Sequence, residues 1–358
     1  MSDTSTRHGA DSSGHLDSGE SGRRSRSRRV KRTALAAAAA VIAVMAMVVG
    51  GGFLYTNRLL SSVHRIPVAA LNAAHQPVMP AATSRSMTIL LTSSTVGAVS
   101  RPAAAGSSSG RPLPAGGLIA LIHFDASQRT GAMISIPSNL MVAVPGHGRA
   151  ILGDALSIGG PSLLIKTVER LTNVRIDHYS ILSVTGALQV IGALGGVDVS
   201  LPYSTTSGSY TFQQGKNHIN GYRAIAYARQ PGVSEIGREL LQQNLIRSIL
   251  IKIARQGLFK SPTVDVRLVR AMAGALSVDS NLSNSGLESL AVRLGKLGSG
   301  AGTFVNTPVL RGSATRGGDR PVYLNRALSG KLWQAIRHDS VAAFALRYPA
   351  TVTSPAPA

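Results

Sequence analysis

The chain has 358 residues, enough for one large globular domain with appended segments. Its formal net charge is +21 with only 16 acidic residues, so polyanions such as nucleic acid, anionic lipid or phosphate-rich polymers are the expected partners. The absence of cysteine excludes a disulfide scaffold, a thiolate metal site and a cysteine nucleophile.

The N-terminal region divides into a basic tail and an apolar segment. Residues 1–32 hold eight basic and four acidic residues, a net charge of +4 (8 − 4), and their Ser/Gly/Arg-rich composition predicts a disordered cytoplasmic tail. Residues 33–55 carry no charge and, at about 1.5 Å per residue, can cross a hydrocarbon core of roughly 30 Å. The preceding basic cluster predicts an uncleaved single-pass anchor with the main domain outside the cytoplasm. A cleaved signal peptide and a buried helix are the alternatives.

The rest of the chain is basic as well, with 29 basic and 12 acidic residues and a net charge of +17 (29 − 12). A domain outside the cytoplasm does not meet nucleic acid, and the sequence has no helix-turn-helix, zinc-finger or aromatic-basic RNA-binding pattern. Lipid phosphates and cell-wall polymers are therefore the expected partners.

An extracytoplasmic tether is expected over residues 56–85 and a globular domain over 86–345. The domain opens with three apolar runs, Met87–Leu91, Gly117–Phe124 and Ala132–Ile136, which predict strands of a sheet covered on both faces.

Helices and strands then alternate. A helix is expected to begin at Gly159-Gly160-Pro161, with proline in its first turn. Strands are expected over His178–Leu182 and Val197–Leu201, with a helix over Val184–Gly196 between them that ends in a glycine pair. This order predicts an α/β (α+β) fold, a central mixed β-sheet flanked by helices.

The C-terminal half is expected to be mostly helical. A long helix runs from the N-cap Ser234 to about Gly257, with Arg238 and Gln242 four residues apart on the face opposite its apolar residues. A disordered tail is expected over 346–358. Three further amphipathic helices and one strand are expected over Val266–Leu276, Ser285–Leu297, Asn325–His338 and Thr303–Leu310.

Several short motifs follow one another in order behind the apolar segment. They are Ser135-Ile136-Pro137, Gly159-Gly160-Pro161, Asp177-His178-Tyr179, Gly195-Gly196-Val197-Asp198-Val199, His218-Ile219-Asn220-Gly221, Tyr227-Ala228-Arg229, Gly237-Arg238 and Gln242-Gln243. Together they resemble the LytR-CpsA-Psr family over roughly residues 85–345, and the chain is identified as a divergent member.

The resemblance implies a phosphotransferase that joins a polyprenyl-pyrophosphate-linked glycopolymer to peptidoglycan, assisted by a divalent cation, usually Mg²⁺. It also implies that the lipid tail lies in a groove of the core. Arg229 and Arg238 match family arginines and would contact phosphate as catalytic residues, while Gln242 and Gln243 match a substrate-binding glutamine pair. Arginine forks and a metal ion suit the dense negative charge of a pyrophosphate.

The chain departs from the family pattern around the expected metal. Ser93 and Ser94 stand where the family has Asp, Ala115–Leu118 where it has Arg-Ser-Asp-Thr, and Ser138-Asn139 where it has Arg-Asp. Ile151 replaces a Lys and Leu241 an Arg.

Only Asp125 and Asp154 are acidic between residues 86 and 165, so the expected Mg²⁺ ligands are Asp154 and Asn139. Two functions stay open: an active glycopolymer transferase, and a catalytically inactive member that binds lipid or wall polymer or assists another protein. A DNA-binding attenuator would need the domain in the cytoplasm.

Overall fold

The computed structural model describes residues 58, 61–72, 76–94, 117–231, 233, 235–256, 266–297, 300, 302–310 and 321–352. The described residues from 61 to 352 belong to one compact unit. The predicted basic tail and apolar anchor, residues 1–32 and 33–55, lie outside the described residues. Among the helices that the structure describes, none is both long and apolar enough to cross a membrane.

A seven-stranded sheet forms the centre of the domain, in the order β1-β12-β7-β2-β3-β4-β13. The pairs β1–β12, β2–β7 and β4–β13 are parallel and the others antiparallel, so the sheet is mixed, as predicted. The strands are β1 (His64–Ile66), β2 (Met87–Ser94), β3 (Ile119–Phe124), β4 (Gly131–Ser135), β7 (His178–Ser183), β12 (Leu276–Asp279) and β13 (Gly302–Asn306).

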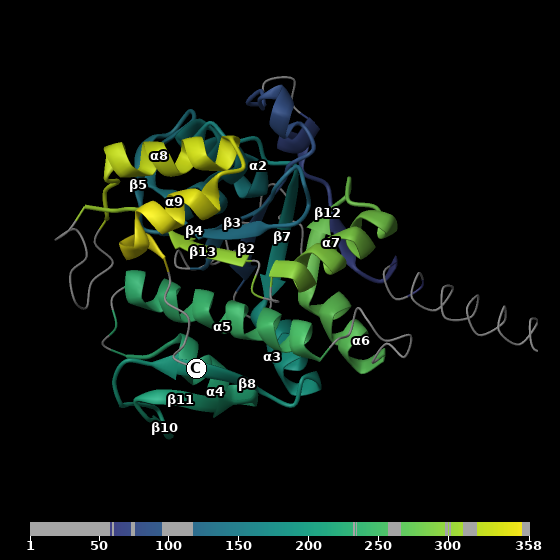
Figure 1. Ribbon diagram of the computed structural model, residues 1–358, viewed down its shortest axis with the longest axis vertical. Coiled ribbons are helices and arrows are strands. Elements are labelled where there is room, and N and C mark those ends of the chain that lie inside the picture. Colours follow the sequence, from purple (N-terminus) through teal and green to yellow (C-terminus); the bar gives the residue numbers. More distant parts are fainter. Residues whose placement is uncertain are drawn as a thin grey trace, which may run out of the picture. The chain divides into compact units, whose positions relative to one another are not determined.

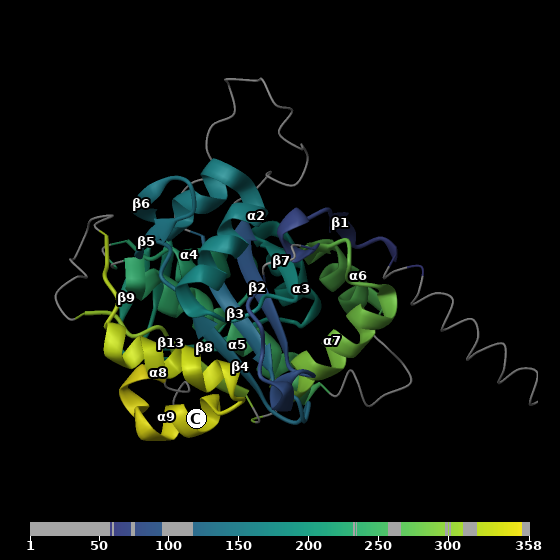
Figure 2. The same cartoon turned by 90° about the horizontal axis from the view of Figure 1, so that it is seen from above.

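Helices cover both faces of this sheet because its strands are apolar on both sides (Figure 1). Leu90 and Tyr179 point toward α2 (Leu152–Thr172), α8 (Arg326–Arg337) and α9 (Val341–Arg347). On the other face, Ile89, Leu91 and Ile122 pack with α5 and α7, and α3 and α6 pack against each other beside them. These four helices are α3 (Val184–Ala193), α5 (Glu235–Arg255), α6 (Val266–Ala275) and α7 (Asn284–Lys296). Figure 2 shows the pairs α6–α7 and α8–α9 on different sides of the domain.

A smaller layer lies on the side of α5 that faces away from the main sheet (Figure 1). Its buried residues include Val199, Ile219 and Tyr227, which pack with Leu241 and Ile253 of α5. The layer consists of the antiparallel pair β8 (Val197–Leu201) and β11 (Gly215–Ile219), the pair β9 (Thr205–Ser207) and β10 (Tyr210–Phe212), and α4 (Gly221–Ala228). The hairpin β5 (Met141–Val144) and β6 (Gly148–Ile151) precedes α2.

Three boundaries differ from the predictions. The expected tether, 56–85, is partly folded: β1 pairs with β12, and the short 3-10 helices η1 (Ala69–Asn72) and η2 (Ala81–Thr83) follow. A strand as short as β1 has no readable periodicity, and its partner lies some 200 residues away.

The second difference is in α2, which begins at Leu152 and is kinked at Gly159 and Gly160. The φ of +63° at Gly160 suits glycine and breaks the helix just before Pro161. The third is in the expected tail, 346–358, since the short 3-10 helix η4 (Pro349–Thr351) follows α9 and Val352 bridges to Val305 of β13.

Candidate functional site

One end of the main sheet collects polar residues, and we call it the polar edge. The register pairs Ser94 with Ser183 and Asn306 with Ser135, so the carboxyl ends of β2, β7, β4 and β13 meet there, together with the start of β3. In open α/β sheets, ligands bind outside the carboxyl ends of strands. The polar edge comprises Ser93, Ser94, Gly117, Leu118, Ser135, Ser138, Asn139, Ser183, Asn306 and Thr307.

Neutral groups tie the polar edge together. The Oγ of Ser93 accepts the backbone N–H of Leu118 at 2.8 Å. A Cβ on Gly117 would stand 2.7 Å from the carbonyl oxygen of Ser93, so a larger residue cannot enter there without moving backbone. The N–H and hydroxyl of Thr307 both donate to the Ser135 carbonyl, at 3.0 and 2.7 Å.

The two expected metal ligands lie on neighbouring backbones at this edge. The N–H of Gly153 donates to the Ser138 carbonyl at 2.7 Å, which sets Asn139 beside the first turn of α2, where Asp154 stands. Asn139 is 6% exposed and its carbonyl accepts the N–H of Val322 at 3.1 Å. Among the described residues, no three His, Asp or Glu side chains gather into a group that could hold a metal ion. Asp154 and Asn139 therefore offer Mg²⁺ one carboxylate and one amide, a donor set that fits it poorly without added phosphate and water oxygens, and the magnesium site stays a prediction.

The long helix α5 brings arginine and glutamine to the polar edge. The Nε2 of Gln243 donates to the Val305 carbonyl at 3.3 Å, and the Arg247 guanidinium lies 4.8 Å from the centre of the Phe304 ring. These contacts show that α5 runs antiparallel to β13. Arg238, about 7.5 Å nearer the N-terminus of α5 than Gln243, therefore lies toward the polar edge.

The two predicted glutamines have different surroundings. Gln243 is fully buried and its amide bonds the sheet, so it positions α5. Gln242 is half-buried on the same side of α5 as Arg238, and its buried Oε1 accepts no hydrogen bond from any described residue. An acceptor in this state suits a hydroxyl donor from a ligand.

Arg229 directly follows α4 and is exposed. The phenol of Tyr227 holds α4 to α5 by accepting the Nδ2–H of Asn244 at 2.8 Å. Burial raises the pKa of Tyr227 to about 12, against a smaller lowering by Asn244, so the phenol stays neutral. The next residue, Gln230, is 1% exposed and accepts the hydroxyl of Tyr203 at 3.4 Å.

The sequence predictions did not include Asn244 or Gln230. The helical period places Asn244 on the side of α5 that faces α4. Recognition of α4 in the sequence would therefore have indicated Asn244 as a contact between the two helices. No pattern in the sequence marks Gln230 as buried.

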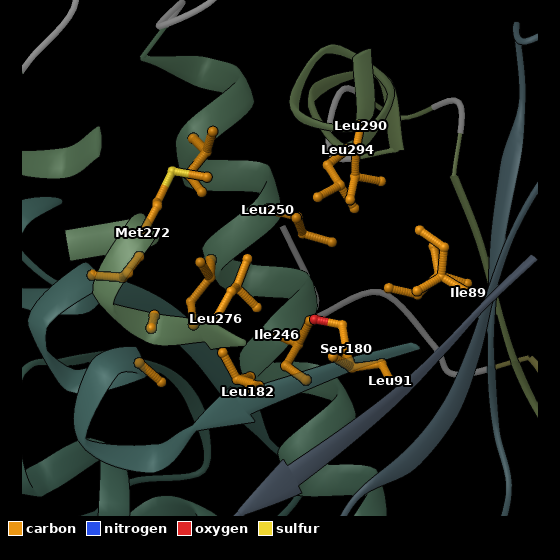
Figure 3. A pocket seen from close by; sticks show the side chains of 16 residues that line it. Ile89, Leu91, Ser180, Leu182, Ile246, Leu250, Met272, Leu276, Leu290 and Leu294 are labelled. Carbon is orange, nitrogen blue, oxygen red and sulfur yellow. The ribbon is translucent and has the colours of Figure 1, made fainter. Parts of the chain in front are cut away.

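An apolar cavity lies between the main sheet and helices α3, α5, α6 and α7 (Figure 3). Its empty volume, which includes open solvent at its mouth, is about 790 Å³. Carbon atoms and the sulfur-bearing side chain of Met272 make up nearly all of the lining. The hydroxyl of Ser180 donates to the Ser277 carbonyl at 3.2 Å, so its proton is not available to a ligand in the cavity.

The cavity and the polar edge share one stripe of α5. Ile246, Ile249 and Ile253 line the cavity, and Gln242 and Arg238 continue the same helical spacing toward the N-terminus. The expectation that Arg238 and Gln242 lie on the face opposite the apolar residues is therefore wrong for these three isoleucines. The arrangement suits an amphiphile whose apolar tail fills the cavity and whose anionic head meets Arg238.

Residues 118–291 match the model of the LytR_cpsA_psr family. The chain carries a LytR-CpsA-Psr domain. The matched span includes every predicted site residue, from Asn139 to Gln243, and most of the cavity lining.

Named relatives share this domain at low identity. The chain is 29% identical over 156 residues to the probable cell wall biosynthesis protein LcpB of Corynebacterium glutamicum, covering 42% of this chain and 38% of LcpB. It is 30% identical over 125 residues to the polyisoprenyl-teichoic acid–peptidoglycan teichoic acid transferase TagU of Enterococcus faecalis, covering 34% of this chain and 41% of TagU. The matches thus span less than half of either relative.

A solved LytR-CpsA-Psr structure has the same fold. The structure of TagT (YwtF) of Bacillus subtilis with bound octaprenyl pyrophosphate superimposes with a TM-score of 0.52 at 19% identity, covering 77% of this chain and 99% of TagT. The central mixed sheet with flanking helices is therefore the LytR-CpsA-Psr fold.

Proposed function

We propose that this protein binds a polyprenyl-(pyro)phosphate-linked glycopolymer during cell-envelope assembly. The observation that carries the proposal is the stripe on α5 that joins the apolar cavity to Gln242 and Arg238. A related structure of the same fold holds octaprenyl pyrophosphate, an amphiphile of this kind.

In this proposal the isoprenoid chain fills the cavity and gains free energy by leaving water, about 25 cal/mol per Å² of apolar surface buried. Arg238 and Arg229 donate charge-assisted hydrogen bonds to the phosphate oxygens. The free Oε1 of Gln242 accepts a hydroxyl of the ligand or of a bound water.

The test is binding of octaprenyl pyrophosphate to the full chain in detergent, followed by native mass spectrometry. We expect a one-to-one complex that Arg238→Ala weakens by at least about tenfold, since a hydrogen bond to a charged group contributes about 1.5–3 kcal/mol. Arg255→Ala, at the exposed end of the same helix, is the matched control and should bind as the unmodified chain does. Absence of any complex would refute the proposal.

A second candidate function is transfer of the polymer to peptidoglycan, which the retained Arg229 and Arg238 and the names of the transferase relatives favour. A sugar hydroxyl would attack the polymer-bearing phosphorus and form a phosphodiester. The bond from that phosphorus to the polyprenyl phosphate would break, the lipid phosphate would leave with the electron pair, and the hydroxyl proton would pass to water. Release of polyprenyl phosphate that depends on added peptidoglycan supports transfer. Binding without release supports an accessory role.

We also propose that residues 33–55 anchor the protein in the cell membrane, with the domain outside the cytoplasm, because they form an uncharged stretch behind a basic cluster. Protease added to spheroplasts should then digest the domain. A domain protected from protease until lysis would count against this placement.

A further inference from the structure

We propose that this protein binds the anionic headgroup with guanidinium and amide groups and without a divalent cation, an inference that rests on the proposed function. Mg²⁺ sites in proteins use one or two carboxylates together with phosphates and waters. The polar edge is built from hydroxyls, an amide and backbone groups, and Asp154 is the acidic residue that the structure places beside it.

Asp125, the other acidic residue between residues 86 and 165, lies far from the polar edge. Asp125 lies in the turn after β3, at the end of the sheet opposite the polar edge, since Phe124 pairs with Met87 at the start of β2. Its carboxylate accepts the N–H of Arg129 at 3.1 Å and the hydroxyl of Ser127 at 2.9 Å. It also accepts the hydroxyl of Thr130.

Except for Glu288, which is exposed on α7, the carboxylates in the rest of the described chain also have partners. The carboxylate of Asp198, for example, lies 2.8 Å from the Nδ1 of His218 and 3.2 Å from the Nζ of Lys216. The carboxylate of Asp279 lies 3.0 Å from the Nδ1 of His178. The described carboxylates with such partners are Asp125, Glu169, Asp177, Asp198, Asp279 and Asp339. A cation that recruited one of them would compete with these hydrogen bonds for the lone pairs of the carboxylate.

The backbone around Ser93 and Gly117 also leaves no room for an added metal-binding side chain. Ser93 uses its Oγ to hold Leu118, and the space that a side chain at Gly117 would need is filled by the Ser93 backbone. Arg238 supplies positive charge on the α5 side of the edge, and a dication placed beside it would be repelled. Asp154 in the first turn of α2 is stabilised by the positive helix N-terminus.

The experiment measures the affinity of the full chain for octaprenyl pyrophosphate in detergent, in excess EDTA and in millimolar MgCl₂. We expect the two dissociation constants to agree within about threefold, a difference of less than 1 kcal/mol. Arg238→Ala should weaken binding by the same factor in both buffers, and Arg238→Lys should restore part of the loss. Titration of MgCl₂ into the ligand-free chain should give no saturable heat.

Binding that EDTA weakens by more than about tenfold would overturn the inference while leaving the proposed function intact. A loss confined to the magnesium buffer in Asp154→Asn would identify the metal ligand and would also overturn it. If EDTA matters and Asp154→Asn does not, another residue supplies the carboxylate, such as Glu235, Glu239, Asp265 or Asp319, which lie outside the described side chains. If neither buffer supports binding, the proposed function itself has failed.

Discussion

Glu169 shows how strongly one buried group can influence this fold. It is 7% exposed on α2, and its Oε1 accepts the N–H of Ile176 at 2.9 Å. Burial raises its pKa from 4.5 to about 7, and the nearby Asp177 adds to the rise, so the folded state favours the protonated form. Its contribution to stability is complete below pH 4.5 and is lost as the pH rises through about 7.

Glu169→Gln should therefore stabilise the protein above pH 7, because the amide stays neutral and can still accept from Ile176. The gain is on the order of 2–3 kcal/mol at pH 8 and close to zero at pH 4.5. Urea unfolding at both pH values measures the gain, with Glu288→Gln, an exposed position on α7, as the control. A variant less stable than the parent at pH 8 would contradict this account of Glu169.

Asp339 has the opposite dependence on pH. Burial alone would raise its pKa, but hydrogen bonds from His123, Ala126 and Ser86, at 2.7–2.8 Å, outweigh burial and hold the pKa below its usual value. The stability that ionised Asp339 contributes is present above the ordinary pKa of 3.8 and is lost as the pH falls through the lowered value.

Asp339→Asn should accordingly destabilise the domain by about 2–4 kcal/mol at pH 7, since it removes charge-assisted bonds around the buried His123. The deficit should shrink toward pH 3. Thermal unfolding across this range tests the prediction, and a deficit that did not depend on pH would show that packing, and not charge, is what Asp339 supplies.

At the scale of elements, α3 and α6 approach so closely that the position of Gly186 has no room for a side chain. A Cβ on Gly186 of α3 would lie 2.2 Å from the Cα of Ala275. On the same helix, a Cβ on Gly192 would meet nothing within 4 Å. Because both helices line the cavity, their spacing also sets its width.

Gly186→Ala should destabilise the protein by about 1–3 kcal/mol and weaken lipid binding, because α3 must move away from α6. Gly192→Ala is the matched control and should be neutral or raise stability by up to about 1 kcal/mol, as alanine favours helix over glycine. Chemical unfolding and octaprenyl pyrophosphate binding of both variants provide the measurement. Equal effects of the two substitutions would refute the close contact.

Comparison of the elements shows what sequence can foresee. Periodicity located α5, α7 and α8 to within two residues at each end, and the apolar runs located β2, β3 and β4. It did not reveal β1, β12 or the hairpin β5–β6, because strands of three or four residues are defined by partners distant in sequence or by a turn. For the site, motif order indicated Arg238 and Gln242. The apolar cavity was expected only through the family resemblance, since its walls come from eight separate elements.

At the scale of the whole molecule, the N-terminal strand belongs to the domain and also reaches the cavity wall. Arg65 of β1 donates to the Leu282 carbonyl at 3.4 Å and to the Oδ1 of Asn284, at the start of α7. Leu290 and Leu294 of α7 line the cavity. The segment first expected to be a tether thus contacts the helix that forms one wall of the apolar cavity.

A chain that begins at residue 76 should therefore unfold at a lower denaturant concentration than one that begins at residue 59, because β12 loses one of its two neighbouring strands and α7 loses the contacts of Arg65. Arg65→Ala in the longer chain should give a smaller loss, about 1–2 kcal/mol. Guanidinium unfolding of the three proteins gives their midpoints, which should rank the longer chain first, Arg65→Ala second and the shorter chain last. Equal midpoints would mean that β1 is dispensable.

The position of α5 between the main sheet and the β8–β11 layer has a consequence for how the sequence can change. From Gly237 to Ala254, every residue whose side chain the structure describes is buried or half-buried, and exposure begins at Arg255. Neutral substitutions normally accumulate at the solvent-exposed positions of a helix, and the described part of α5 has almost no such positions. In a saturation library selected for folding and lipid binding, α5 should therefore be the most intolerant helix, with polar positions such as Asn244 constrained as tightly as its leucines.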